Sequence, residues 1–227
     1  RETFGPVRDP EALLRKVRAR LVQRPVDDLR IDFEDGLGPR SASDEDVLAT
    51  RAGTELAHAF REGQGARQMG LRIRPLDAAT GARGLRTLSL FLRALVASLG
   101  GATFPPLVLT LPKVQHVESV RVACEGLLEF ERTHTFAVNT VRLEVMIEDL
   151  PSLAPSFLAS ILNAGGARLS ALHLGNYDLT ASAGVLAPDQ HFSHPYCDHA
   201  LMRLQAACAG THVVVSAGAT TRLPLAN

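Results

Sequence analysis

The sequence has no tryptophan, two tyrosines and only three cysteines. Cys124, Cys197 and Cys208 are too few and too irregularly spaced for a disulfide framework or a zinc site, which indicates reduced thiols in a cytoplasmic protein. An excess of charge is also missing, because 24 Lys and Arg residues balance 24 Asp and Glu residues. A net charge of zero gives no overall field that would hold nucleic acid or an anionic membrane, so neither partner is expected.

Long apolar runs are absent as well. No run approaches the roughly 18 residues that a membrane-spanning helix requires, and the first ten residues lack the basic and then apolar form of a secretory signal. What remains is ordinary globular composition, with 46% hydrophobic and 21% charged residues. The 227 residues are enough for one large α/β unit. Since no linker divides the chain, we expect a single domain over residues 1–227.

Short apolar runs alternate with longer segments of helical periodicity. Six strands are predicted, over 29–33, 70–74, 107–111, 142–147, 171–174 and 212–215. Helices are predicted from Asp9-Pro10 onward, from a capping arrangement at Ser43 and Asp46 as far as Arg61, and over 84–99, 114–131, 152–163 and 195–209. Residues 176–194 form the one long segment that is predicted to be irregular. Strands that alternate with helices favour βαβ units and a parallel sheet.

The predicted strands have two different faces. In LRIDFE (29–34) apolar side chains alternate with charged ones, and LRIR (71–74) and RLEVMIE (142–148) show the same alternation. Parallel strands that are covered on both faces are instead nearly continuous apolar runs. A closed barrel explains the alternation, because one face of each strand meets the helices and the other points into a shared interior. That interior would hold a charge-balanced set of Arg30, Arg72, Arg74, Arg142, Asp32, Glu34, Glu144 and Glu148.

The sequence therefore predicts a TIM (β/α)8 barrel, although it supplies six strands instead of eight. Its length is also below the roughly 250 residues that are typical of this fold. We therefore expect the first and the last strand to be missing from the chain as given, one before Arg1 and the other after Asn227.

In such barrels the active site lies at the C-terminal ends of the strands. The residues at these positions are rich in carboxylates and include no Ser-His-Asp or Cys-His arrangement: Glu34, Asp35, Arg72, Arg74, Pro112, Lys113, Glu148, Asp149 and 175–178. Converging carboxylates are natural ligands of Mg2+ or Mn2+. An arginine that faces them can hold an acid substrate or stabilise an enolate oxygen. The combination favours chemistry on a carbon–carbon bond next to a carbonyl.

Five short motifs occur in order along the chain: DFEDG at 32–36, LRIR at 71–74, LPKV at 111–114, MIED at 146–149 and HLGNYDLTASAG at 173–184. They resemble the DLEDAV, VRVN, LPKV, LIET and FGAEDLAADLG motifs of the HpcH/HpaI aldolase and citrate lyase beta-subunit family, over roughly residues 29–215. The resemblance implies a TIM barrel that uses a divalent cation to cleave or join carbon–carbon bonds. The substrates of that family are 2-oxo acids or 3-hydroxyacyl-CoA thioesters, and the implied barrel includes an opening and a closing strand.

The resemblance also implies a metal site. Glu148 and Asp178 match the glutamate and the aspartate that bind the metal, so that Mg2+ or Mn2+ is the implied cofactor. The alternative for both residues is a strand-end acid that caps a helix N-terminus. Arg72 matches an arginine that resembles an anchor for an oxyanion and a carboxylate. Its alternative is a structural ion pair with Glu34 or Glu144.

Three further residues complete the set that the resemblance places near the site. Glu34 and Asp35 match an acidic pair whose expected role is to orient the water on the metal. Lys113 matches the lysine of the LPK motif, and it is open between a ligand contact and a solvated loop position. Asp32, which lies deeper along its strand, is expected to have a structural role.

The chain departs from the family motifs at Arg74 in place of Asn, Asp149 in place of Thr, and Asn176-Tyr177 in place of Ala-Glu. These changes predict substrate contacts that differ from those of the citrate lyase type. Three histidines, His191, His194 and His199, lack the spacing of a zinc motif, which favours loop capping or contacts in a lid. His173 could be a metal ligand or a base, although a hydrogen-bonded interior residue is the favoured interpretation.

The sequence thus predicts a metal-dependent carbon–carbon lyase or aldolase. We expect its substrate to be a small carboxylate, with a CoA thioester as one form, and we expect a homo-oligomer. One alternative is an enzyme of phosphoenolpyruvate chemistry that stabilises the same enolate, but no phospho-histidine motif supports it. A second alternative is a barrel that binds a metal or an acid without turnover.

Overall fold

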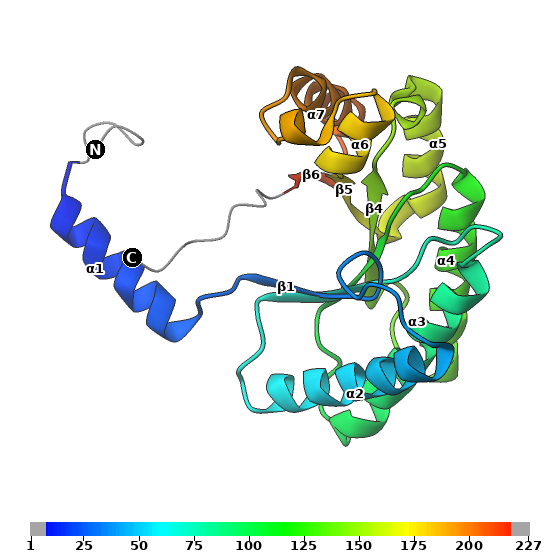
Figure 1. Cartoon of the computed structure of the whole chain (residues 1–227). Helices are drawn as coiled ribbons and strands as arrows, with labels where there is room; N and C mark the ends of the chain where they lie inside the picture. Colours follow the sequence, from blue (N-terminus) through cyan, green and yellow to red (C-terminus); the bar gives the residue numbers. More distant parts are fainter. Residues whose placement is uncertain (1–7, 219–227) are drawn as a thin grey trace.

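Six parallel strands form the centre of the molecule (Figure 1). The computed structural model describes residues 8–218. The strands are β1 (Asp28–Asp32), β2 (Gln68–Arg72), β3 (Leu107–Leu111), β4 (Val141–Ile147), β5 (Leu169–Leu174) and β6 (Val214–Ala217). They are hydrogen-bonded in sequence order from β1 to β6, and every neighbouring pair is parallel. A strand order that follows the sequence is the topology of a (β/α) barrel, whereas a doubly wound sheet reverses its order at a switch point.

Helices connect the strands and cover the outer side of the curled sheet (Figure 1). They are α1 (Pro10–Gln23), α2 (Ala42–Arg61), α3 (Gly81–Leu99), α4 (Val117–Thr133), α5 (Pro155–Gly165), α6 (Asn176–Ser182) and α7 (Pro195–Cys208), with short 3-10 turns η1 (Pro151–Leu153), η2 (Gly166–Arg168) and η3 (Ala187–Asp189). Helix α1 differs from the rest, because it has no buried residue and projects away from the body. No helix in residues 8–218 is both long enough and apolar enough to cross a lipid bilayer.

The prediction of a parallel α/β barrel is confirmed in its coarser form, as a half-barrel of six strands. All six strands lie where the sequence places them, with ends that differ by at most two residues. The two further strands of a (β/α)8 barrel would lie outside the described residues, so they stay a prediction.

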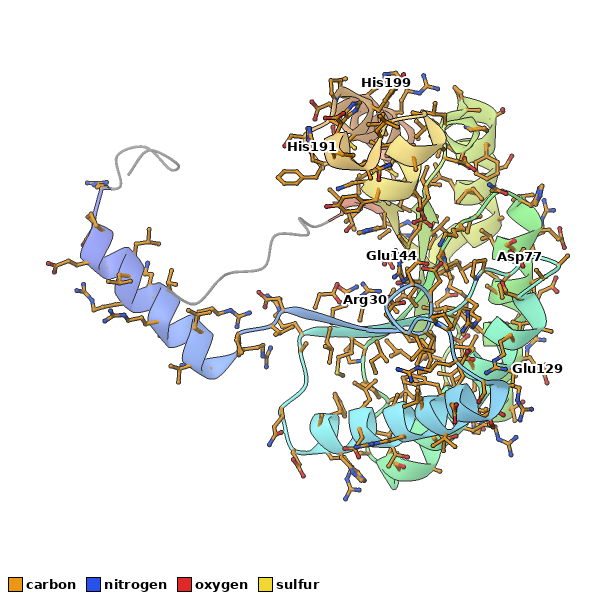
Figure 2. The ribbon with its side chains drawn as sticks, in the orientation of Figure 1. Arg30, Asp77, Glu129, Glu144, His191 and His199 are labelled. Atoms are coloured by element: carbon orange, nitrogen blue, oxygen red, sulfur yellow. The ribbon has the colours of Figure 1, made fainter. Side chains whose placement is uncertain are left out.

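The alternation of the strands separates an apolar outer layer from a polar inner face. Leu71, Leu109 and Leu143 lie in register on three neighbouring strands and are fully buried in the core. On the opposite face, Thr110 of β3 accepts a hydrogen bond from Arg30 of β1 (3.0 Å) and donates one to Glu144 of β4 (2.7 Å). Figure 2 shows Arg30 and Glu144 close together at the centre of the sheet. Opposite charges on the inner face therefore compensate one another, as a buried polar layer requires.

Several boundaries differ from the prediction. Helix α2 is capped by Ser41 rather than Ser43, because the Ser41 hydroxyl accepts the Asp44 N–H (3.1 Å). Helices α4 and α5 each begin three residues later than predicted. The segment 176–194 is not irregular throughout, since it contains α6 and the turn η3. The short length of α6 and the mixed composition of HLGNYDLTASAG hide its periodicity from sequence inspection.

Candidate active site

The C-terminal ends of β1 and β4 and the first turn of α6 converge on Lys113, which follows β3. Its ammonium group contacts Glu34 and lies 3.1 Å from both carboxylate oxygens of Asp35. It also lies 3.5 Å from Asp178 Oδ2. The prediction left Lys113 open between a ligand contact and a solvated loop position, and the structure places it at the centre of the acidic cluster. Its pKa is lowered by burial but raised more by Glu34 and Asp35, with a net shift upward.

The backbone of Lys113 contributes as much as its side chain. Its φ of 49° lies in the left-handed region, which is uncommon for a residue other than glycine and is found preferentially at functional sites. In this conformation the Lys113 N–H donates a hydrogen bond of 2.6 Å to Glu148 Oε2. Lys113, two residues after the end of β3, therefore fixes the Glu148 carboxylate with its backbone and reaches Asp178 with its side chain.

Glu148, which follows β4 directly, is buried beneath the loops. Its pKa is raised to about 7, because burial and the negative charge of Asp178 together outweigh the hydrogen bond from Lys113 N–H, which lowers it. Gly175 makes room for this carboxylate, because a Cβ at position 175 would overlap Glu148 Oε1. Sequence reasoning missed this role of Gly175, although its position at the end of β5 next to a predicted metal ligand was a signal.

Glu34 forms the link between Lys113 and Arg72. Its side chain is buried, and it lies in ion-pair contact with Lys113 and 3.4 Å from Arg72 Nη1. Burial raises the pKa of Glu34, and the hydrogen bond from Lys113 only partly offsets that effect. Asp35, in contrast, keeps 63% of its side chain exposed. The two acids of this pair therefore lie in different environments although they are adjacent in the sequence.

Arg72 lies at the end of β2 and is held by Asp32. Its Nε donates to Asp32 Oδ1 (2.7 Å), and its Nη2 contacts the other oxygen of the same carboxylate. Asp32 also accepts the backbone N–H groups of Glu34 (2.9 Å) and Gly36 (2.8 Å), so it shapes the turn after β1 as well. Burial would raise the pKa of Asp32, but the bonds from Arg72 and the backbone outweigh it and lower the pKa. Asp32 thus has the structural contacts that were expected of it.

A cleft of about 380 Å³ opens beside this cluster. Lys113, Glu148 and Asp178 line it together with Leu76 and His116, which follow β2 and β3. Sequence reasoning did not select Leu76 or His116, because neither belongs to a motif of charged residues at a strand end. Four elements that are far apart in the sequence therefore share one cavity at the end of the sheet where (β/α) barrels carry their active sites.

The prediction that Arg74 faces the barrel interior is wrong. Strand β2 ends at Arg72, and the chain then turns toward the start of α2. There the guanidinium of Arg74 donates to the buried Glu45, at 3.0 and 2.8 Å, and Glu45 also accepts the Thr87 hydroxyl (2.6 Å). Arg74 therefore joins the end of β2 to α2 and α3, and its departure from the family motif does not add a positive charge to the cleft.

Asp149 also has a local role. One of its oxygens accepts the Ser152 N–H (2.8 Å) at the start of η1, and the other accepts Gln115 Nε2 (2.9 Å). These contacts hold the loop after β4 against the loop after β3. Asp149 lines the cleft, but both of its carboxylate oxygens already have protein partners.

The four histidines that the sequence analysis considered make no contact with the acidic cluster: His173, His191, His194 and His199. His173 is partly buried on the inner face, with Nδ1 2.8 Å from the Ser216 hydroxyl, as expected of a hydrogen-bonded interior residue. His194 precedes α7 and accepts the Tyr196 N–H (3.2 Å), which agrees with the expectation of loop capping. Figure 2 shows His191 and His199 beside α6 and α7, apart from Arg30 and Glu144 at the centre of the sheet.

A divalent cation fits the donor set at Glu148 and Asp178. The residues described by the structure contain no group of three or more His, Cys, Asp or Glu side chains arranged to hold a metal. Mg2+, however, often takes only one or two protein carboxylates and completes its octahedron with water and substrate oxygens. Glu148 and Asp178 line the same cleft, and the charge of Asp178 raises the pKa of Glu148, so a bound cation would relieve their mutual repulsion.

Solved structures of similar fold are a citrate lyase from Burkholderia xenovorans LB400 and malate synthase from Haloferax volcanii. The first has a TM-score of 0.65 and 23% identity, and the match covers 95% of this chain and 62% of that one. The second, in its lead(II) complex, has a TM-score of 0.62 and 16% identity, and the match covers 86% of this chain and 62% of that one. The chain thus spans less than two thirds of either length. At these identities the similarity concerns the fold.

No curated protein matches the sequence. A family model matches residues 8–227, which is nearly the whole chain. The chain belongs to the family described as "Domain of unknown function (DUF6986)".

Proposed function

We propose that this chain carries the active site of a carbon–carbon lyase or aldolase that acts on a 2-oxo acid or a 3-hydroxyacyl group. The observation that supports it best is the convergence of Glu34, Lys113, Glu148 and Asp178, from four separate elements, beside one cleft at the C-terminal ends of the strands. The fold similarity to a citrate lyase and a malate synthase agrees with this class of reaction. The proposal remains compatible with a free acid or a CoA thioester.

In this proposal Glu148 and Asp178 hold Mg2+ or Mn2+. When bound, the cation supplies positive charge that stabilises an enolate oxygen and helps to hold the carboxylate of the substrate. The hydrogen bond from Lys113 N–H keeps Glu148 in place, and the missing side chain at Gly175 leaves the carboxylate its space. Asp178, with 43% of its side chain exposed, is accessible from the cleft.

Arg72 and Glu34 have separate tasks in this scheme. Asp32 takes Nε and Nη2 of Arg72 and thereby fixes the plane of the guanidinium. The remaining nitrogen of Arg72, Nη1, lies toward Glu34 and is the one that can donate to an anionic oxygen. Outside the pair proposed to hold the metal, Glu34 is the carboxylate suited to hold or move a proton, because it is buried beside Lys113 and burial raises its pKa. Asp35 and Lys113 hold Glu34 and order water near it.

The proposal is tested by metal titration followed by assays with oxaloacetate, malyl-CoA, and pyruvate plus an aldehyde. Retro-aldol or aldol product that depends on Mg2+ or Mn2+ would support it. E148A and D178A should each abolish turnover and weaken Mn2+ binding. The exposed E129A on α4 is the matched control and should change neither.

Two rival functions are outcomes of the same experiment. Tight metal binding without product from any of the acids tested would favour a barrel that binds a metal or an acid without turnover. Turnover of phosphoenolpyruvate alone would favour the enolate chemistry of that substrate instead. Unchanged metal affinity in E148A and D178A would contradict the metal site itself. Arg74 departs from the family motif, but it pairs with Glu45 outside the cleft, so this departure does not favour the non-catalytic alternative.

A further inference from the structure

The chain uses almost only arginine as its positively charged residue. Among its 24 Lys and Arg residues there are two lysines, Lys16 and Lys113. Lys16 is exposed on the projecting helix α1. Lys113, in contrast, lies among carboxylates beside the cleft. An ammonium group therefore replaces the usual guanidinium at the position where the acidic side chains converge.

The ammonium of Lys113 occupies a site that is rich in negative charge. It lies within ion-pair distance of Glu34, Asp35 and Asp178, and Glu148 is fixed by the backbone N–H of the same residue. In the part of the chain that the structure describes, Lys113 is the one cation in ion-pair contact with Asp178. Arg72 Nη1 lies 3.4 Å from Glu34, so two cations, Lys113 and Arg72, face the four carboxylates, and the net charge of the cluster is negative when all four are ionised.

The chemistry of the two cationic side chains explains why lysine suits this position. A guanidinium is planar and presents its donors in a rigid fork, which matches a single carboxylate. An ammonium is a compact point charge with three donors, so it can satisfy carboxylates that approach from three directions. A small divalent cation likewise binds oxygen ligands that approach it from several directions. The Lys113 ammonium and a divalent cation are therefore attracted to the same carboxylate of Asp178.

We propose that Lys113 is an internal counter-cation that competes with the divalent metal for Asp178, so that metal binding releases the ammonium from this carboxylate. The proposal rests on the metal site of the proposed function. The freed ammonium keeps its contacts with Glu34 and Asp35, which lie on the β1 side of the cluster. Lys113 thereby limits the affinity for metal and offsets part of the negative charge of the acidic cluster while no metal is bound.

The backbone of Lys113 makes the competition separable from a positioning effect. Glu148 accepts the N–H of residue 113, and any residue other than proline supplies that donor. Replacing lysine with methionine removes the charge and keeps a side chain of similar length. K113R keeps the charge in a different shape. K16M removes the other lysine, on α1, and serves as the control.

Isothermal titration with Mn2+ gives the first readout. K113M should bind Mn2+ about tenfold or more tightly than the parent protein, because a positive charge close to Asp178 no longer repels the metal. The Mn2+ affinity of K113R should lie near that of the parent protein, and the affinity of K16M should equal it. In EDTA, K113M should melt at a lower temperature because Glu34 loses its counter-charge, and the rise in melting temperature on adding Mn2+ should be larger than in the parent. If K113M fails to fold, the double variant E34Q/K113M removes both charges, and the same tighter binding is expected.

Nuclear magnetic resonance gives the second readout. Protein labelled with 15N only in its lysine side chains carries two ammonium groups, one of which is removed in K16M. The ammonium of Lys113 should be detectable without metal, because its ion pairs slow proton exchange, and Mg2+ should shift its signal. No such shift is expected in E148A/D178A.

The outcomes separate this inference from the proposed function. If neither the parent protein nor K113M binds Mn2+, the metal site fails and the inference fails with it. If the parent binds Mn2+ through Glu148 and Asp178 but K113M binds equally or more weakly, the competition is wrong and the proposed function stands. A Lys113 signal that Mg2+ leaves unchanged would overturn the competition in the same way.

Discussion

Two clusters of charged side chains lie at opposite ends of the strands, and they are built in opposite ways. At the N-terminal ends of β4 and β5, Arg168 and Glu131 form a buried pair, with 4% and 0% of their side chains exposed. Both Glu131 oxygens accept a 2.7 Å bond from Arg168, and they also accept the backbone N–H groups of Asn139 and Val141 at 3.0 Å. One positive charge meets one negative charge, and the carboxylate oxygens are fully satisfied.

In the cluster at the C-terminal ends the negative charges outnumber the positive ones. Four carboxylates face only two cations, Lys113 and Arg72, the pKa of Glu148 is raised to about 7 with burial as the largest cause, and the pKa of Glu34 is raised as well. At Glu131, in contrast, burial is outweighed by the bonds from Arg168 and the backbone, and the pKa is lowered. In (β/α) barrels the N-terminal face serves stability and the C-terminal face serves catalysis. The difference between the two clusters follows this division.

Removing Arg168 should have the largest effect on stability. R168M leaves the ionised Glu131 buried without its partner, so the free energy of unfolding should fall by about 3–5 kcal/mol. Chemical denaturation measures the change. The control is R121M, which breaks the exposed pair with Glu118 and should cost less than about 1 kcal/mol. Equal losses in the two variants would contradict the structural role of the buried pair.

At the C-terminal ends of the strands, removal of a buried charge should affect turnover instead of stability. E148Q keeps an acceptor for the Lys113 N–H and removes a buried charge that faces Asp178. We expect turnover to fall on the order of 100-fold or more, while the free energy of unfolding in EDTA changes by less than about 1 kcal/mol. Kinetic assays and denaturation of the same preparation test both halves. A loss of stability as large as that of R168M would remove the distinction between the two clusters.

The pH dependence of stability should report on Glu131. Since its folded-state pKa is lowered, its contribution is fully present above the unfolded value of 4.5 and is lost as pH falls through the folded pKa. The free energy of unfolding should therefore decrease below about pH 4.5, and it should decrease less steeply in the double variant E131Q/R168M. Parallel slopes in the two proteins would show that Glu131 does not have the lowered pKa.

The smallest of these effects is expected at Gly175. The Cβ of G175A would overlap Glu148 Oε1 and displace the carboxylate from its place beside the cleft. Metal affinity should fall by about tenfold, as is usual when a supporting position next to a metal ligand is changed. The φ of −86° at this residue suits alanine, so stability should change little. Mn2+ titration and denaturation measure the two quantities, and a variant with full metal affinity would show that Glu148 has room to move.

The periodicity of the sequence was sufficient to predict the half-barrel. The two-residue alternation in LRIDFE and RLEVMIE predicted which side chains meet the helices and which face inward, and Leu143 and Glu144 lie as expected on opposite sides of β4. The six predicted site residues also lie in one connected cluster, because the C-terminal ends of neighbouring parallel strands meet at one edge. Their roles in binding and catalysis stay predictions.

Pairings between distant segments could not be predicted in the same way. Arg74 continues the alternation of LRIR, but the strand ends two residues earlier, and Arg74 forms an ion pair with Glu45 of α2. The pairing of Glu131 with Arg168 joins the end of α4 to the turn before β5, and neither residue stands in a motif. The central position of Lys113 depends on its left-handed backbone, which one lysine in a sequence does not reveal.

The most direct measurement is a crystal structure of the protein with Mg2+ and oxalate, a stand-in for the enolate of pyruvate. The account predicts Mg2+ at about 2.0–2.1 Å from carboxylate oxygens of both Glu148 and Asp178, with oxalate and water completing the octahedron. Mg2+ at the histidines before and in α7, or at carboxylates other than Glu148 and Asp178, would contradict it.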